Sequence, residues 1–114
     1  MQTLVSQLSV VKKAHLQTLA FARPRLSRCG LTPSRFELLR AVQKAGGTCD
    51  QRELTTFLSV SGASVCRLLR VLVTLGYVEH LRDQPDGRRR TVRITADGAE
   101  RAKKGSAALQ GRLT

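Results

Sequence analysis

The spacing of apolar residues changes once along this chain, and the change limits the folds open to it. Between residues 33 and 75, apolar residues recur at every third or fourth position, as on the buried face of an α-helix. Over residues 77–82, and again over residues 90–95, they alternate with polar residues, as in a half-buried β-strand. The sequence therefore predicts a mainly α fold with a small β-hairpin near its C-terminal end.

Two helices are expected in the first half of the chain. The first covers residues 2–22, where apolar residues form one stripe. Pro24 should end or kink it, because proline lacks an amide N–H and clashes with the preceding turn. The second helix should begin at Thr32 and Pro33, a capping hydroxyl followed by proline at the first helical position.

Two further helices, joined by a tight turn, are expected after residue 50. Asp50 is a capping residue, and Glu53 three positions later would complete a capping box. The predicted inward residues of this third helix are Leu54, Phe57 and Leu58. Ser61 should cap a fourth helix over residues 61–75, after a turn as short as a helix–turn–helix requires.

The fourth helix has an outward face suited to the DNA major groove. Its expected buried residues are Val65, Leu68, Leu69 and Leu72, and its outward residues are Ala63, Cys66, Arg67 and Arg70. Small residues permit close approach to base edges, and arginine reaches guanine or phosphate. Ser61 and Ser64 could bond phosphate at the helix N-terminus. The alternative is an ordinary amphipathic helix with solvated arginines.

A basic hairpin follows, with strands expected over residues 77–82 and 90–95. Its five cations within twelve residues are Arg82, Arg88, Arg89, Arg90 and Arg93. An arginine at a narrow hairpin tip can enter the minor groove, where the potential is most negative. Asp86 could hold Arg88 by an ion pair. The alternative is a charged tip that keeps an exposed strand edge soluble.

A last helix of roughly a dozen residues should start at Thr95 or Asp97 and end near Gly105 or Gly111. Its predicted stripe is Ala99, Ala102, Ala107 and Leu109.

Composition narrows the class of function. The net charge of +12 and the isoelectric point near 11.3 indicate a polyanion as partner. Arg35 and Arg52 are candidates for additional phosphate contacts. No stretch is long and apolar enough for a membrane span, and the N-terminus lacks a signal-peptide pattern, so we expect a cytoplasmic protein. No catalytic constellation is apparent, and we expect neither enzyme activity nor a cofactor.

The three cysteines lack the spacing of a zinc site, and we expect no metal. Cys29 and Cys49 are interpreted as small apolar fillers. Cys66, beside Arg67 and Arg70, could be an oxidisable thiol. We prefer to interpret Cys66 as a small residue at a DNA-contact position.

Six segments in order resemble the MarR family of bacterial transcriptional regulators. They are Leu31-Thr32-Pro33-Ser34-Arg35-Phe36-Glu37-Leu38-Leu39, Gln51-Arg52-Glu53-Leu54, Val60-Ser61 through Arg67-Leu68-Leu69, Leu75-Gly76-Tyr77-Val78-Glu79, Arg82-Asp83 to Asp86-Gly87-Arg88, and Val92-Arg93-Ile94-Thr95-Ala96-Asp97-Gly98. Each segment alone is a weak indication, but their order and spacing are fairly specific. The resemblance covers residues 31–98 and implies a winged helix–turn–helix fold.

The resemblance further implies a homodimer that binds a near-palindromic operator, usually as a repressor. The family's recognition-helix contacts fall here on Ser61, Ala63, Ser64, Cys66 and Arg67, and its wing contact falls on Arg88 with Asp86 as support. Arg70 departs from the family, where acidic residues are common. The family often responds to small aromatic acids or oxidants, but an effector for this chain stays open.

The expected organisation is an N-terminal dimerisation helix over residues 1–30, the DNA-binding domain over residues 31–98, and a short helix and tail over residues 99–114. Family chains continue into helices that complete the dimer, so residues 2–22 would supply most of the dimer contact here. Two alternatives remain: an accessory protein of a mobile element that acts through protein contacts, and an RNA-binding protein.

Overall fold

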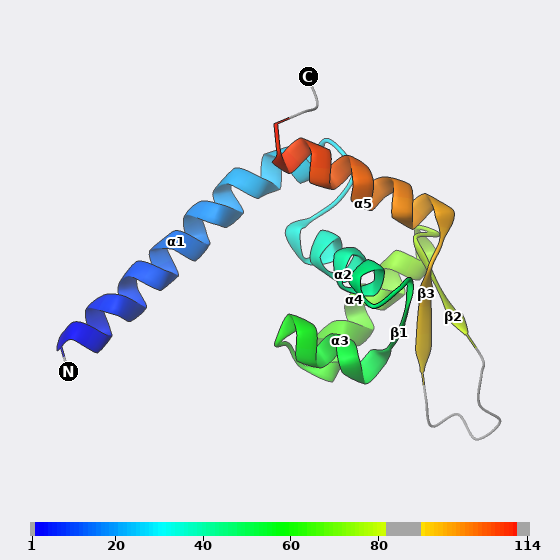
Figure 1. Ribbon diagram of the computed structural model, residues 1–114, viewed down its shortest axis with the longest axis horizontal. Coiled ribbons are helices and arrows are strands. Elements are labelled where there is room, and N and C mark those ends of the chain that lie inside the picture. Colours follow the sequence, from blue (N-terminus) through cyan, green and yellow to red (C-terminus); the bar gives the residue numbers. More distant parts are fainter. Residues whose placement is uncertain (1, 82–89, 112–114) are drawn as a thin grey trace.

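The computed structural model describes residues 2–81 and 90–111 (Figure 1). Their elements are α1 (Gln2–Ser27), α2 (Pro33–Lys44), β1 (Thr48–Asp50), α3 (Gln51–Leu58), α4 (Gly62–Thr74), β2 (Val78–Leu81), β3 (Thr91–Ile94) and α5 (Ala96–Leu109). The predicted mainly α fold with a small hairpin is confirmed. The hairpin is part of a larger sheet, because β1 also joins it.

The three strands form an antiparallel sheet in the order β1-β3-β2. Val92 of β3 lies opposite Cys49 of β1 and His80 of β2. Cys49, Val78 and Val92 are buried, so one face of this small sheet closes the hydrophobic core.

Helix α2 lies at the centre of the core. Leu38, Leu39 and Val42 are completely buried, and α2 contacts every other helix as well as β1 and β3. Leu54 of α3 and the predicted inward residues of α4 complete the cluster, although Leu68 is only partly buried. The spacing of three and four residues therefore identified this part of the core correctly.

Four predicted capping side chains accept a hydrogen bond from a backbone amide at the start of a helix: Thr32, Asp50, Ser61 and Thr95. The capping box at Glu53 is not formed as predicted. Asp50 accepts from the Arg52 amide at 2.9 Å, and the Glu53 carboxylate instead lies 3.5 Å from the Cys49 sulfur.

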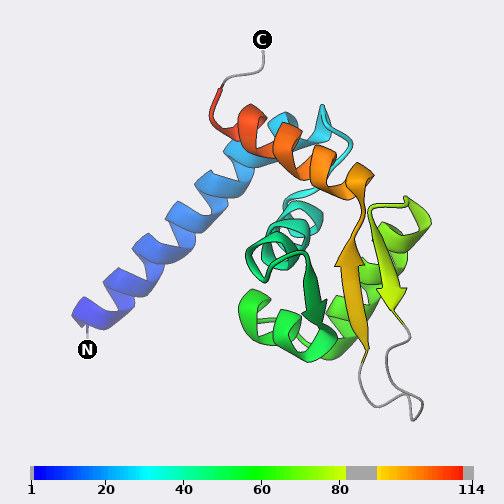
Figure 2. The same cartoon turned by 45° about the vertical axis from the view of Figure 1, so that its right-hand side comes forward.

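Helix α1 continues through Pro24 to Ser27, so the prediction that it ends near residue 22 is wrong. Burial of Ala22 and Leu26 against the rest of the fold stabilises the last turns, which offsets the hydrogen bond that proline cannot make. The N-terminal part of α1 extends away from the other elements in both views (Figures 1 and 2).

Helix α5 buries a different set of residues from the predicted stripe. Its buried positions are Gly98, Ala102, Gly105 and Ala108, so of the predicted stripe only Ala102 is buried. A Cβ atom added to Gly98 would overlap the backbone oxygen of Tyr77, and one added to Gly105 would lie 2.8 Å from the Phe36 ring. The two glycines therefore let α5 pack closely on the fold.

Phe57 was predicted to point inward, but 63% of its surface is exposed. Helix α3 has only eight residues, and Leu54 is its one fully buried side chain. Phe57 lies instead at the edge of a hollow between α2 and α3 that Phe36 and Leu58 also line.

Candidate nucleic-acid interface

Helices α3 and α4 form the expected helix–turn–helix. The chain bends by 111° between them, within the range of about 90–120° typical of this motif. Ser59 makes the turn in the left-handed region, with φ of 53°. No single helix of the described ranges is long and apolar enough to cross a membrane, and only this sharply bent pair reaches the required length and hydropathy when taken together.

Three polar side chains are linked along the start of α4. The Ser61 hydroxyl accepts a hydrogen bond from the Ser64 amide and donates one to the Ser64 hydroxyl, both at 3.1 Å. The Arg67 guanidinium donates to the same Ser64 oxygen at 3.2 Å. These bonds restrict the arginine before any ligand arrives, which lowers the entropy lost on binding.

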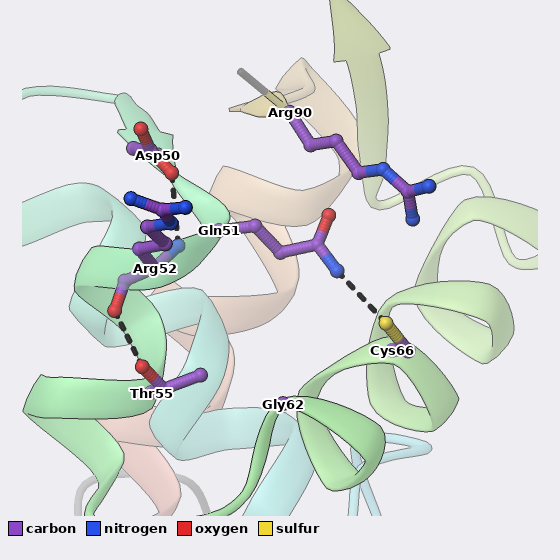
Figure 3. A pocket seen from close by; sticks show the side chains of 7 residues that line it. All are labelled: Asp50, Gln51, Arg52, Thr55, Gly62, Cys66 and Arg90. Carbon is purple, nitrogen blue, oxygen red and sulfur yellow. Dashed lines mark hydrogen bonds between the residues drawn. The ribbon is translucent and has the colours of Figure 1, made fainter. Parts of the chain in front are cut away.

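The outward face of α4 is narrower than predicted. Ala63, Arg67 and Arg70 are exposed, but Cys66 is half-buried. Its sulfur accepts a hydrogen bond from the Gln51 side-chain amide at 3.0 Å (Figure 3). Cys66 therefore lies on the side of α4 that packs against α3, and it is not an open contact position in this structure.

A hollow of about 230 Å³ lies beside Cys66 (Figure 3). Its lining residues are Asp50, Gln51, Arg52, Thr55, Gly62, Cys66 and Arg90. Arg52 and Arg90 were predicted from separate segments as DNA-contact residues, and the fold places both around this hollow next to α4. The carboxylate of Asp50 is occupied in capping α3.

Gln51 of α3 connects α4 with the residue before β3, and no role was predicted for it from the sequence. Its backbone amide donates to the Arg90 carbonyl at 2.8 Å, and its side chain donates to Cys66. The side-chain oxygen Oε1 is buried without a hydrogen-bond partner among the described residues. Nothing in the local pattern distinguished Gln51, because its role depends on residues distant in sequence.

The remaining residues predicted to contact DNA are not among those that line the hollow beside α4. Arg35 lies in the first turn of α2, half-buried, and its side chain does not line the hollow beside α4. Arg88, Arg89 and the supporting Asp86 lie outside the described residues.

Arg93 is paired within the sheet. It lies opposite Glu79 in the β2–β3 register and forms an ion pair and hydrogen bonds with that carboxylate. By sequence position alone, Arg93 belongs with the cations of the basic tip. The Glu79 carboxylate compensates the charge of Arg93. Arg90, the residue just before β3, is therefore the better candidate for a nucleic-acid contact.

The cysteines are consistent with packing roles. Cys29 and Cys49 are buried. Burial, a hydrogen bond to Glu53 and the negative charges of Glu53 and Asp50 raise the pKa of Cys49 to about 12. Its thiol therefore stays protonated and unreactive near neutral pH. In the part of the chain that the structure covers, no three His, Cys, Asp or Glu side chains gather as metal ligands.

Comparison with known families supports this architecture. A model of the MarR family matches residues 30–89, which include the helix–turn–helix and the strand β2 but end before β3. No curated protein matches the sequence.

Solved structures of MarR-family proteins have the same fold. A cysteine mutant of MarR from E. coli in complex with operator DNA is 23% identical with a TM-score of 0.82, over 98% of this chain and 85% of that one. A MarR-family transcriptional regulator from Rhodococcus sp. RHA1 is 16% identical with a TM-score of 0.86, over 98% and 79% of the two chains. NadR in complex with 4-hydroxyphenylacetate is 22% identical with a TM-score of 0.78, over 90% and 72%. The fold is therefore a winged helix–turn–helix.

Proposed function

The chain belongs to the MarR family, and on this premise we propose that it is a transcriptional regulator that binds a specific double-stranded operator as a homodimer and represses transcription. The observation that carries the proposal is the hydrogen-bonded series Ser61–Ser64–Arg67 at the start of α4, in which Ser61 and Arg67 are exposed. The E. coli relative bound to operator DNA supports the same class of ligand.

Helix α4 would enter the major groove. Ala63 is small enough to let the helix approach the bases, and Arg67 and Arg70 can donate to guanine or phosphate. The hydroxyls of Ser61 and Ser64 would bond a phosphate where the helix dipole favours negative charge. Cys66 would contribute through its contact with Gln51, which fixes α4 against α3.

A second set of contacts would come from the wing. Arg88, Arg89 and Arg90 would reach the minor groove and its phosphates, with Asp86 supporting Arg88. Arg52, around the same hollow as Arg90, would bind the DNA backbone beside α4. Arg35 would add a backbone contact from α2.

Dimerisation would rest on α1. Ala22 and Leu26 in the C-terminal part of this 26-residue helix are buried, and the N-terminal part of the helix extends from the fold (Figure 1). Leu16 and Phe21 are exposed by 56% and 47%. A projecting helix gains most of its stability from packing against a partner. A second copy of this chain would provide that packing and set the spacing of two recognition helices.

The test is a salt titration on an operator selected from a random duplex pool and on a scrambled duplex. We expect Arg67→Ala to weaken operator binding by about 1–3 kcal/mol and to affect the scrambled duplex less, because a base contact is lost. Arg89→Ala should weaken both duplexes similarly, because a phosphate contact is lost. Equal losses on both duplexes for Arg67→Ala would refute base recognition by α4.

Lys103→Ala is the matched control, since it removes one exposed positive charge from α5. It should leave binding to both duplexes nearly unchanged. Light scattering of the complex should give two chains per operator. Binding of A-form RNA as tight as that of the operator would instead favour an RNA-binding function.

A further inference from the structure

A second basic region lies between the end of α1 and the helix α5. Arg25, Arg28, Arg101 and Lys104 line a hollow of about 470 Å³, together with the small residues Cys29 and Ala108. We propose that this hollow binds a small anion that carries two or more phosphate groups. The site is separate from the proposed DNA interface, because α5 and α3 lie at opposite ends of the fold in both views (Figures 1 and 2).

The charge of this hollow distinguishes it from four others that the described residues form. Each of those has a carboxylate in its lining: Asp50 beside Cys66, Glu37 in the two hollows next to α2, and Glu100 in the groove between α2 and α5. None of them has more than two cationic side chains in its lining. The hollow between α1 and α5 has four cations and no carboxylate, so its basic character is a local feature and not only the consequence of a basic chain.

Two of the four cations are already held in place. The Arg25 guanidinium lies 3.7 Å from the centre of the Phe21 ring and donates to the Phe21 carbonyl at 2.9 Å. Arg101 donates to the Cys29 carbonyl at 2.9 Å. Their remaining N–H groups stay available for a ligand, and an arginine that is ordered in advance loses less entropy on binding.

The partial negative charge at the C-terminal end of α1 does not explain why four cations lie around this hollow. The C-terminus of a helix carries about half of a negative elementary charge. Arg101 already donates to the Cys29 carbonyl two residues beyond the end of α1, and one cation near the helix end is enough to offset such a partial charge. In residues 2–81 and 90–111 the only ion pair joins Arg93 and Glu79, so the four cations have no carboxylate partner there.

The residue types indicate the class of ligand. Three arginines offer planar, paired donors that match phosphate oxygens, and lysine adds a compact charge. The volume of about 470 Å³ falls within the range of roughly 300–1,000 Å³ typical of small-molecule sites. A small ligand with several phosphate groups would use all four cations, whereas a single carboxylate would leave most of them unpaired.

The experiment uses tripolyphosphate as the probe, titrated into the protein by calorimetry at an ionic strength of about 0.15 M to screen long-range attraction. One variant combines Arg28→Gln and Lys104→Gln, and the matched control combines Arg67→Gln and Arg70→Gln. Each pair removes two positive charges from exposed positions. Arg25 and Arg101 are left intact because they also donate to backbone carbonyls, Arg25 to that of Phe21 in α1 and Arg101 to that of Cys29 just after α1.

We expect the first variant to weaken tripolyphosphate binding by about tenfold or more, and the control by less than about twofold, because only the first loses direct contacts. Amide NMR shifts on titration should concentrate at Cys29 and Ala108. Equal weakening in the two variants, or a larger loss in the control, would overturn the proposal. Thermal unfolding of each variant verifies that both are folded.

A duplex titration distinguishes a free phosphate compound from DNA as the ligand. The first variant should bind the selected operator like the unmodified protein, whereas the control should bind it weakly. If the first variant lost operator affinity as strongly as the control, the hollow would be a DNA contact and the small-molecule proposal would be wrong. Failure of tripolyphosphate to bind at all would also reject the site, without affecting the proposed operator binding.

Discussion

Helices α4 and α5 have nearly the same length, 13 and 14 residues, but they pack in opposite ways. Helix α4 buries large aliphatic side chains, namely Val65, Leu69 and Leu72. Helix α5 buries glycine and alanine. The first is stabilised mainly by the apolar area removed from water. The second is stabilised by close approach of its backbone to neighbouring elements, which multiplies weak dispersion contacts.

The stability contributed by the two helices should therefore respond to opposite changes in side-chain size. Removal of atoms should damage the packing of α4, because it leaves a cavity. Addition of atoms should damage the packing of α5, because no space is left for them.

The largest effect is expected for Gly98→Ala. The new Cβ would overlap the Tyr77 carbonyl oxygen, a backbone atom that cannot move without shifting the connection between α4 and β2. We expect the free energy of unfolding to fall by about 4 kcal/mol or more, above the usual cost of overpacking. Urea unfolding followed by circular dichroism measures this change.

The matched control is Gly62→Ala, at the start of α4, where an added Cβ meets no atom within 4 Å. It should change stability by less than about 1 kcal/mol, on the stabilising side, because alanine favours the helix. If Gly98→Ala were as well tolerated as this control, close packing of α5 would not be a determinant of the fold.

Leu72→Ala tests the opposite dependence in α4. Leu72 is completely buried, and its truncation should lower the free energy of unfolding by about 3 kcal/mol through lost burial and the cavity left behind. The neighbouring Val73 is 36% exposed, and Val73→Ala should have a much smaller effect. Equal losses for these two variants would contradict the assignment of the buried face.

The smallest effects are expected at the helix caps. Thr95 accepts a hydrogen bond from the Gly98 amide at 3.0 Å and also donates one to the Gly76 carbonyl at 2.6 Å. Thr95→Ala should therefore cost about 2 kcal/mol and Ser61→Ala about 1 kcal/mol, since Ser61 caps an exposed helix start. Thermal unfolding of both variants compares them. A larger loss for Ser61→Ala would reverse this order.

Features determined by neighbouring residues could be predicted from the sequence. The caps at Thr32, Asp50, Ser61 and Thr95 need only a side-chain oxygen two or three residues before an amide. The buried stripe of α4 needs only the helical period. The same period predicted the exposure of Arg67 and Arg70, which is confirmed, whereas their contact with DNA stays a prediction.

Features that depend on distant residues could not be predicted. Cys66 is half-buried because Gln51, fifteen positions earlier, bonds its sulfur. Arg93 pairs with Glu79 only once the strand register is set. The hydrophobic pattern overlooked Gly98 and Gly105 because it scores apolar side chains, whereas glycine contributes by having none. The continuation of α1 past Pro24 depends on burial of Leu26 by the folded chain.

The fit of Gly98 against Tyr77 also has an evolutionary consequence. A chain that keeps the same crossing of α5 over the end of α4 can accept no other residue at this position without moving the backbone. We therefore expect glycine to persist here in distant homologues, even where the exposed residues of α4 have diverged. Under the proposed function, conservation of this one glycine would follow the shared fold, whereas variation at positions 63, 67 and 70 would follow the DNA sequence that each homologue binds.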